Sequence, residues 1–122
     1  MKLNLGCGHD HKDGYINVDV SDLGNPDQVV DLEVLPWPWE DNAVDEILIK
    51  HTLEHLGQAT KLYLDIMCEF WRICQDGALI KIIVPHHRHD HFLNDPTHVR
   101  AITPGGLELF SQKKNLEWIE KG

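Results

Sequence analysis

The sequence lacks most features that mark secreted, membrane-spanning and nucleic-acid-binding proteins. Three cysteines among 122 residues are too few for a disulfide framework, and their odd number favours reduced thiols in a cytoplasmic protein. Cys68 and Cys74 fall in an apolar pattern and are expected in the core. No apolar run approaches the roughly 18 residues of a membrane span, so no membrane partner is expected. Lysine and arginine total 11 against 20 acidic residues, and the net charge of -9 argues against a nucleic-acid partner.

What the sequence does contain is a series of short apolar segments separated by turns. We expect strands at 2–5, 15–20, 28–33, 43–50 and 78–84. Apolar residues recur every three or four positions across 58–75, which predicts one long helix with Gly77 as its C-terminal cap. Thr103-Pro104 predicts the start of a last helix that runs to about Phe110. Apolar strands followed by helices or crossovers predict a single α/β domain, residues 1–122, with a parallel sheet.

Glycines and acids follow the first three predicted strands, at the edge where parallel sheets bind ligands. The Gly6-Cys7-Gly8 turn allows a ligand to come close to the backbone. Asp19 ends the second strand, where a carboxylate typically accepts hydrogen bonds from ribose hydroxyls. Asp31-Leu32 follows in the third segment. Position 11 holds His11 in place of the third glycine of a dinucleotide fingerprint, which argues against a pyrophosphate-binding turn. The glycines and acids together indicate a site for a nucleoside.

These segments give the sequence a resemblance to the class I S-adenosylmethionine-dependent methyltransferases. The motifs that carry it are LNLGCG, GYINVD, DL, LPW, VDEI and HTLEH, in this order from residue 3 to residue 55. The resemblance implies a Rossmann-like, mostly parallel sheet of strand order 3-2-1-4-5 with helices on both faces. The family sheet usually has two further strands after the fifth. Only NLEWIE (115–120) is a candidate here, so the C-terminal strands are expected to be short or missing.

The resemblance also implies roles for individual residues. The Gly6-Cys7-Gly8 turn would line the methionine part of S-adenosyl-L-methionine, and Asp19 would bind its ribose hydroxyls. Asp31 and Leu32 would face the adenine. His51, which ends the fourth predicted strand, would lie beside both the methionine moiety and the methyl acceptor.

The expected activity is transfer of a methyl group from S-adenosylmethionine to an O, N or C nucleophile of a small-molecule or glycan-type acceptor. The sulfonium is already activated, so the protein mainly aligns donor and acceptor. His51 and His86 are candidate bases for an acceptor that must lose a proton, because the pKa of histidine lies near working pH. Two alternatives stay open. One is a cofactor-binding module without a complete acceptor site, and the other is a nicotinamide oxidoreductase.

Two histidine-rich segments raise the question of a metal. HTLEH (51–55) matches the H-x-x-E-H pattern of inverzincin metalloproteases. In such proteases the motif lies within a helix, whereas here it begins where a predicted strand ends, so Glu54 and His55 are interpreted as orienting the loop into the long helix. In HHRHDH, the residues His87, His89 and His91 would share one face of an extended loop. A polar loop near the acceptor pocket is the preferred interpretation, and no metal is expected.

Trp37 and Trp39 allow two interpretations. They either cover the adenine or a flat acceptor, or they pack their loop onto the edge of the sheet, which is the commoner role of such residues.

The fifth predicted strand raises the question of assembly. In the strand order 3-2-1-4-5 it borders the strands that the chain is expected to lack, and Lys81 is its only charge. A long apolar edge with unpaired backbone groups tends to recruit another chain. We therefore expect a homodimer whose interface includes residues 78–84 or the C-terminal segment.

Overall fold

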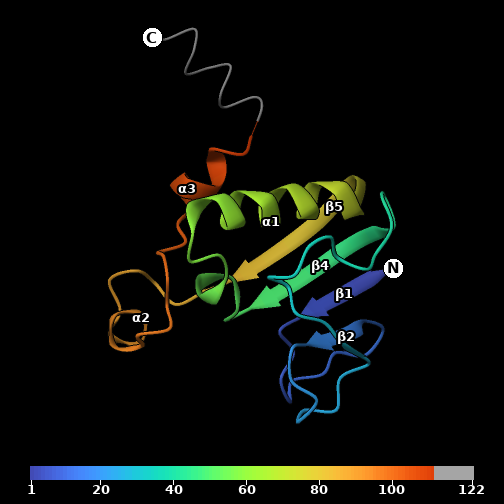
Figure 1. Ribbon diagram of the computed structural model, residues 1–122, viewed down its shortest axis with the longest axis horizontal. Helices are drawn as coiled ribbons and strands as arrows, with labels where there is room; N and C mark the ends of the chain where they lie inside the picture. The colour runs from blue at the N-terminus through green and yellow to red at the C-terminus, as the bar shows by residue number, and fades with distance from the viewer. Residues whose placement is uncertain (112–122) are drawn as a thin grey trace, which may run out of the picture.

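The computed structural model describes residues 1–111, which form a parallel sheet of five strands in the order β3-β2-β1-β4-β5 (Figure 1). The strands are β1 (Lys2–Leu5), β2 (Ile16–Asp19), β3 (Gln28–Val29), β4 (Val44–Lys50) and β5 (Cys74–Ile83). Every pairing is parallel, so the carboxyl ends of the strands meet at one edge. The predicted α/β class, the strand order and the parallel sheet are confirmed.

One long helix, α1 (Thr60–Ile73), joins β4 to β5 and covers the sheet on one side (Figure 1). Its fully buried residues Ile66 and Ile73 belong to the same apolar cluster as Leu3, Leu5 and Ile47 of the strands. The periodicity that predicted the helix is therefore the periodicity of its buried face. Three short helices follow the strands: η1 (Leu53–His55), α2 (Asp90–Asn94) and α3 (Pro104–Glu108).

The connections before β4 contain turns in place of helices. The sequence predicted helices on both faces of the sheet, but within residues 1–111 the structure has one long helix, α1. A buried amide network holds the first connection. The Asn4 side chain donates to Asn17 Oδ1 at 2.9 Å, and the backbone N–H of Lys12 donates to the same oxygen at 2.8 Å. Asp27 in turn accepts from the backbone N–H of Asn17 at 2.7 Å. In the absence of a crossover helix, these side-chain bonds satisfy the polar groups of the connection.

The tryptophan loop packs into the core. Trp37 and Trp39 are 2% and 5% exposed, and Trp37 contacts Phe70 of α1 edge-on at 5.0 Å between ring centroids. Arg72 fastens the loop to α1, because its guanidinium donates to the carbonyls of both tryptophans and to the carboxylate of Glu69. Of the two interpretations of these tryptophans, the packing role is the one the structure supports.

Several boundaries differ from those expected. Gly77 does not cap α1, which ends at Ile73; the capping residue is Cys74, whose N–H donates to the Phe70 carbonyl. Gly77 lies inside β5 with φ of 79°, near a register shift between β4 and β5. Strand β3 has two residues, since the chain turns inward at Leu32, and the segment 86–98 contains α2.

The prediction that both C-terminal cysteines lie in the core is wrong for Cys68, which is exposed, while Cys74 is half-buried. Cys68 shares a face of α1 with Leu64 and Trp71, which are 46% and 81% exposed. The apolar pattern on α1 is therefore wider than the face that the sheet covers, so an apolar residue on this helix need not be buried.

Strand β5 forms one edge of the sheet in the part of the chain that the structure describes. The segment NLEWIE, a possible cover for that edge, lies outside the described residues. None of the helices found in residues 1–111 has the length and apolar content to cross a membrane.

Candidate functional site

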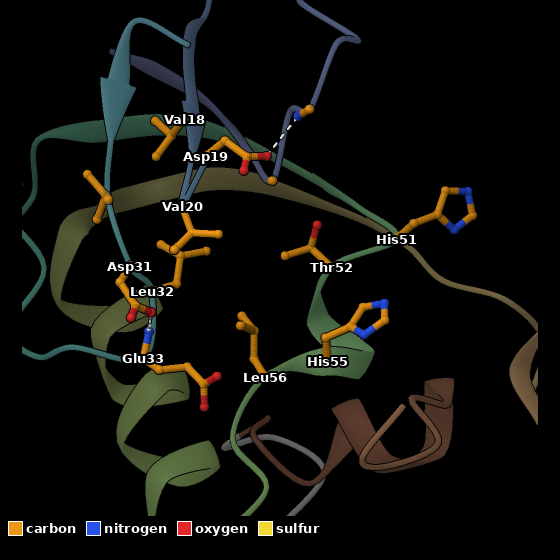
Figure 2. A pocket seen from close by; sticks show the side chains of 13 residues that line it. Val18, Asp19, Val20, Asp31, Leu32, Glu33, His51, Thr52, His55 and Leu56 are labelled. Carbon is orange, nitrogen blue, oxygen red and sulfur yellow. Dashed lines mark hydrogen bonds between the residues drawn. The ribbon is translucent and has the colours of Figure 1, made fainter. Parts of the chain in front are cut away.

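A pocket of about 460 Å³ opens at the carboxyl ends of the strands, where the sequence placed the chemistry (Figure 2). This volume is in the range of small-molecule sites. Six of the expected site residues line it, namely Gly6, Gly8, Asp19, Asp31, Leu32 and His51. The other lining residues are Val18, Val20, Val30, Glu33, Thr52, His55 and Leu56.

The two glycines after β1 have different structural roles. Gly6 has φ of +69°, and a Cβ on it would lie 1.9 Å from Oγ1 of Thr52. Only glycine allows the first loop to pack against Thr52, the second residue after β4. Gly8 has φ of +50°, and a Cβ on it would meet no atom within 4 Å. Gly8 therefore keeps an open backbone face on the wall of the pocket.

Cys7, between these glycines, is absent from the pocket lining. Its N–H donates to the Val18 carbonyl at 3.0 Å, and its side chain is 5% exposed. Burial raises the pKa of its thiol. The buried side chain of Cys7 therefore does not face the pocket in which the cofactor contact was expected. The backbone bond of Cys7 holds the loop against β2.

Asp19 stands at the end of β2 and faces the glycine turn (Figure 2). Its Oδ2 accepts from the Gly8 N–H at 2.8 Å, and its Oδ1 accepts from the Ser21 N–H at 2.9 Å. A carboxylate has about four lone-pair positions, so each oxygen can accept one further bond. The carboxylate is therefore held rigidly, with capacity left for a pair of hydroxyls.

One wall of the pocket is acidic and apolar. Asp31 and Glu33 lie on one side of the pocket, and His51 and His55 lie on the other (Figure 2). Glu33 Oε2 accepts from the Gly57 N–H at 3.3 Å, and Asp31 Oδ1 accepts from the Glu33 N–H at 2.9 Å. No lysine or arginine lines the pocket among residues 1–111. Its charged side chains are carboxylates, which favour a ligand that carries positive charge.

His51 follows β4 in a left-handed conformation, with φ of 51°. This conformation is uncommon for a residue other than glycine, and non-glycine residues with such backbones concentrate at functional sites. The His51 N–H donates to the Ile83 carbonyl at 2.7 Å, which fixes the residue between the ends of β4 and β5. Its side chain is exposed to solvent.

His86, the second candidate base, does not line the pocket. Its Nδ1 accepts from the Arg88 N–H at 3.1 Å, and its ring stacks on His87 at 4.3 Å between centroids. His89 caps α2 by accepting from the His91 N–H at 3.1 Å. The histidines of this loop therefore make local hydrogen bonds, as a polar loop would.

Sequence reasoning missed the contribution of Thr52, His55 and Leu56 to the pocket. The signal is present, because Thr52 and His55 belong to the motif HTLEH directly after β4 and Leu56 follows this motif. It was interpreted as a loop that orients the long helix. In the structure Leu53–His55 form η1, and Thr52, His55 and Leu56 line the pocket.

Comparisons with known proteins agree with this fold. No family model and no curated protein matches the sequence. The structure is similar to that of a SAM-dependent methyltransferase from Archaeoglobus fulgidus, with a TM-score of 0.70 and 22% sequence identity. The likeness covers 88% of this chain and 57% of the other, so the chain spans little more than half the length of that protein. The chain therefore shares the fold of that protein, with the Rossmann-like parallel sheet that the sequence motifs implied.

Proposed function

We propose that the chain binds S-adenosylmethionine in this pocket and transfers its methyl group to a nucleophilic acceptor. The observation that carries the proposal is Asp19, a carboxylate held at the end of β2 with free acceptor positions beside an open glycine wall. A vicinal pair of ribose hydroxyls matches those positions. Leu32, 6% exposed beside Asp31, supplies an apolar surface for a flat base.

The charge of the pocket favours S-adenosylmethionine over a nicotinamide dinucleotide. A dinucleotide carries a pyrophosphate, which needs backbone N–H groups or cations to neutralise it. Here Asp19 occupies the Gly8 N–H, and the pocket lining within residues 1–111 offers carboxylates in place of lysine or arginine. A sulfonium and an ammonium group suit this acidic lining.

S-adenosylmethionine, when bound, supplies an activated methyl group, so the residues of this chain need mainly to align the acceptor. His51 is the one candidate base that lines the pocket, beside Thr52 and His55. Its place at the end of β4 suits removal of a proton from a hydroxyl or amine acceptor. We propose a small-molecule or glycan-type acceptor that enters on the side of the pocket formed by these histidines.

Calorimetry tests the binding step. S-adenosylhomocysteine should bind to the wild-type chain, and NAD should give no heat of binding. Asp19→Ala should weaken S-adenosylhomocysteine binding by about 1.5–3 kcal/mol, the scale of hydrogen bonds to a charged group. Asp22→Ala, a change of the same type at an exposed residue outside the pocket, should leave the affinity unchanged. Unchanged affinity in a folded Asp19→Ala variant would remove Asp19 from the ribose role.

A second pair of variants probes the glycine wall. Gly8→Ala and Gly14→Ala place the same methyl group at left-handed positions where a Cβ meets no atom within 4 Å. Only Gly8 lines the pocket. Gly8→Ala should therefore weaken S-adenosylhomocysteine binding, whereas Gly14→Ala should not. Equal affinities in the two variants would place the ligand away from the glycine wall.

A further inference from the structure

A cluster of three potential ligands lies beside the pocket and takes no part in the proposed binding of S-adenosylmethionine. One ligand atom each from Glu54, His55 and His98 lies within 4.8 Å of the others. Two of these residues belong to η1, and the third comes from a segment more than 40 positions later. The Val99 N–H donates to the Glu54 carbonyl at 2.8 Å, which holds that later segment against η1. The cluster is therefore a product of the tertiary fold.

Glu54 is the member that calls for an explanation. Its side chain is 1% exposed, and within residues 1–111 neither carboxylate oxygen has a hydrogen-bond partner. An ionised carboxylate that is buried without a partner is strongly destabilising, so buried carboxylates are paired or coordinate metals. His55 Nε2 lies 3.5 Å from Glu54 Oε1.

The hydrogen bonds of His55 fix which of its ring nitrogens carries a proton. The Thr97 hydroxyl donates to Asp95 at 2.6 Å, so its oxygen must accept in the 2.9 Å contact with His55 Nδ1. His55 Nδ1 also lies 3.2 Å from the Thr97 carbonyl, which can only accept. Nδ1 therefore bears the proton. In a neutral ring Nε2 then presents a lone pair to Glu54.

His98 has the same arrangement. Its Nδ1 lies 2.8 Å from the Phe92 carbonyl, so this nitrogen donates. Its Nε2 lies 3.5 Å from Asp95 Oδ2, and its side chain is 7% exposed. Histidines that bind metals commonly donate the second ring N–H to a backbone carbonyl, which fixes the tautomer and the orientation of the ring. Both imidazoles of the cluster have this supporting bond.

We propose that Glu54, His55 and His98 form a binding site for a divalent transition-metal cation of the Zn²⁺ type. Two imidazoles and one carboxylate are a ligand set of zinc and non-haem iron sites. Bonds of about 2.1 Å in a tetrahedron separate ligand atoms by about 3.4 Å, close to the 3.5 Å between His55 Nε2 and Glu54 Oε1. The cation would neutralise Glu54 and accept the lone pairs that face it. This proposal departs from the expectation of no metal drawn from the sequence.

The site would be open on one side. Three protein ligands leave a coordination position for water or for an oxygen donor of a bound molecule. His55 also lines the pocket, so the cation would lie at the wall of the pocket on the side of His51 (Figure 2). The histidine loop at 86–91 is a separate feature, since none of its members joins the cluster.

Titration with Zn²⁺ after chelator treatment and dialysis tests the site. Calorimetry should show one equivalent bound to the wild-type chain. His55→Gln, His98→Gln and Glu54→Gln should each weaken that binding at least about tenfold, since even supporting residues of metal sites change affinity by 10–100-fold. The matched control is the double variant His87→Gln and His91→Gln, which removes two loop imidazoles and should leave the affinity within about twofold. Loss of binding in the control with retention in the three cluster variants would overturn the proposal.

A measurement on the wild-type chain alone guards against variants that fail to fold. Long-range ¹H–¹⁵N spectra of the histidine rings report each tautomer. Before Zn²⁺ is added, His55 and His98 should carry their proton on Nδ1, and Zn²⁺ should then shift the Nε2 signals of these two residues. Protonation of both nitrogens at neutral pH, with no response to Zn²⁺, would mean that imidazolium ions neutralise Glu54 and that the metal site does not exist.

Discussion

Replacing Gly6 by alanine should destabilise the fold more than the same change at Gly14, a left-handed glycine with open surroundings. Gly6 and Gly14 have φ of +69° and +81°, so both variants carry a similar backbone strain. They differ in surroundings. A Cβ at Gly6 would lie 1.9 Å from Thr52 Oγ1, 2.8 Å from Thr52 Cβ and 2.9 Å from Thr52 Cγ2, whereas a Cβ at Gly14 would meet nothing within 4 Å.

Backbone strain and steric crowding together set the size of the loss in stability. A left-handed backbone costs an alanine about 1–2 kcal/mol, and forcing extra atoms into a packed site costs about 1–3 kcal/mol. Gly14→Ala should therefore lower the free energy of unfolding by about 1–2 kcal/mol, and Gly6→Ala by about 2–5 kcal/mol. The difference isolates the contact with Thr52, because strain is common to both variants.

Urea unfolding followed by tryptophan fluorescence measures both variants, since Trp37 and Trp39 lie in the core. Thr52→Ala removes the Oγ1 and Cγ2 atoms that the new methyl group would meet. In that background the penalty of Gly6→Ala should fall by at least about 1 kcal/mol, which is a coupling energy typical of residues in contact. Equal penalties at Gly6 and Gly14, or no coupling to Thr52, would refute the close approach of the first loop to the end of β4.

Three further measurements test other parts of the structure. The hydrogen bond from Tyr15 to Glu46 raises the pKa of Tyr15 to about 12 and lowers that of Glu46, so stability should decline as pH falls below 4.5 or rises above 10.0. Urea unfolding across this pH range should show a weaker dependence for Tyr15→Phe at both ends. Arg72→Ala leaves the buried carboxylate of Glu69 without its guanidinium partner and should lower the free energy of unfolding by about 2–4 kcal/mol. Lys61→Ala, which breaks an exposed ion pair, should leave the free energy of unfolding almost unchanged. Light scattering at micromolar concentration should show a dimer if the edge of β5 pairs with a second chain, and a monomer would contradict that prediction.

The sheet could be predicted because its signals are local. The strands are short segments rich in apolar residues and separated by turns, and parallel strands bring their carboxyl ends together. Asp19 and Gly8 could be predicted for this reason, since Asp19 ends β2 and Gly8 belongs to the turn after β1. Their mutual hydrogen bond is a consequence of the parallel pairing of β1 and β2.

The features that escaped prediction depend on contacts between distant residues. His55 and His98 are brought together by a backbone bond from Val99 to Glu54, and no local pattern encodes that bond. Gly77 was predicted as a helix cap because a left-handed glycine after an apolar helix is typical of a cap, but such a glycine also occurs in an irregular strand. The exposure of Cys68 depends on how much of α1 the sheet covers, which is a property of the assembled layers.

The helix-free connection between β1 and β2 also affects how the chain can fold. Asn4 and Asn17, which are register partners in these strands, are 13 positions apart, whereas Asn4 and its partner Leu48 in β4 are 44 positions apart. Loop-closure entropy grows with the logarithm of length, so the shorter closure costs about 1 kcal/mol less. Contacts near in sequence also form on faster timescales. The half of the pocket that contains Gly8 and Asp19 can therefore form early, and the half that contains the histidines forms only after β4 has paired with β1.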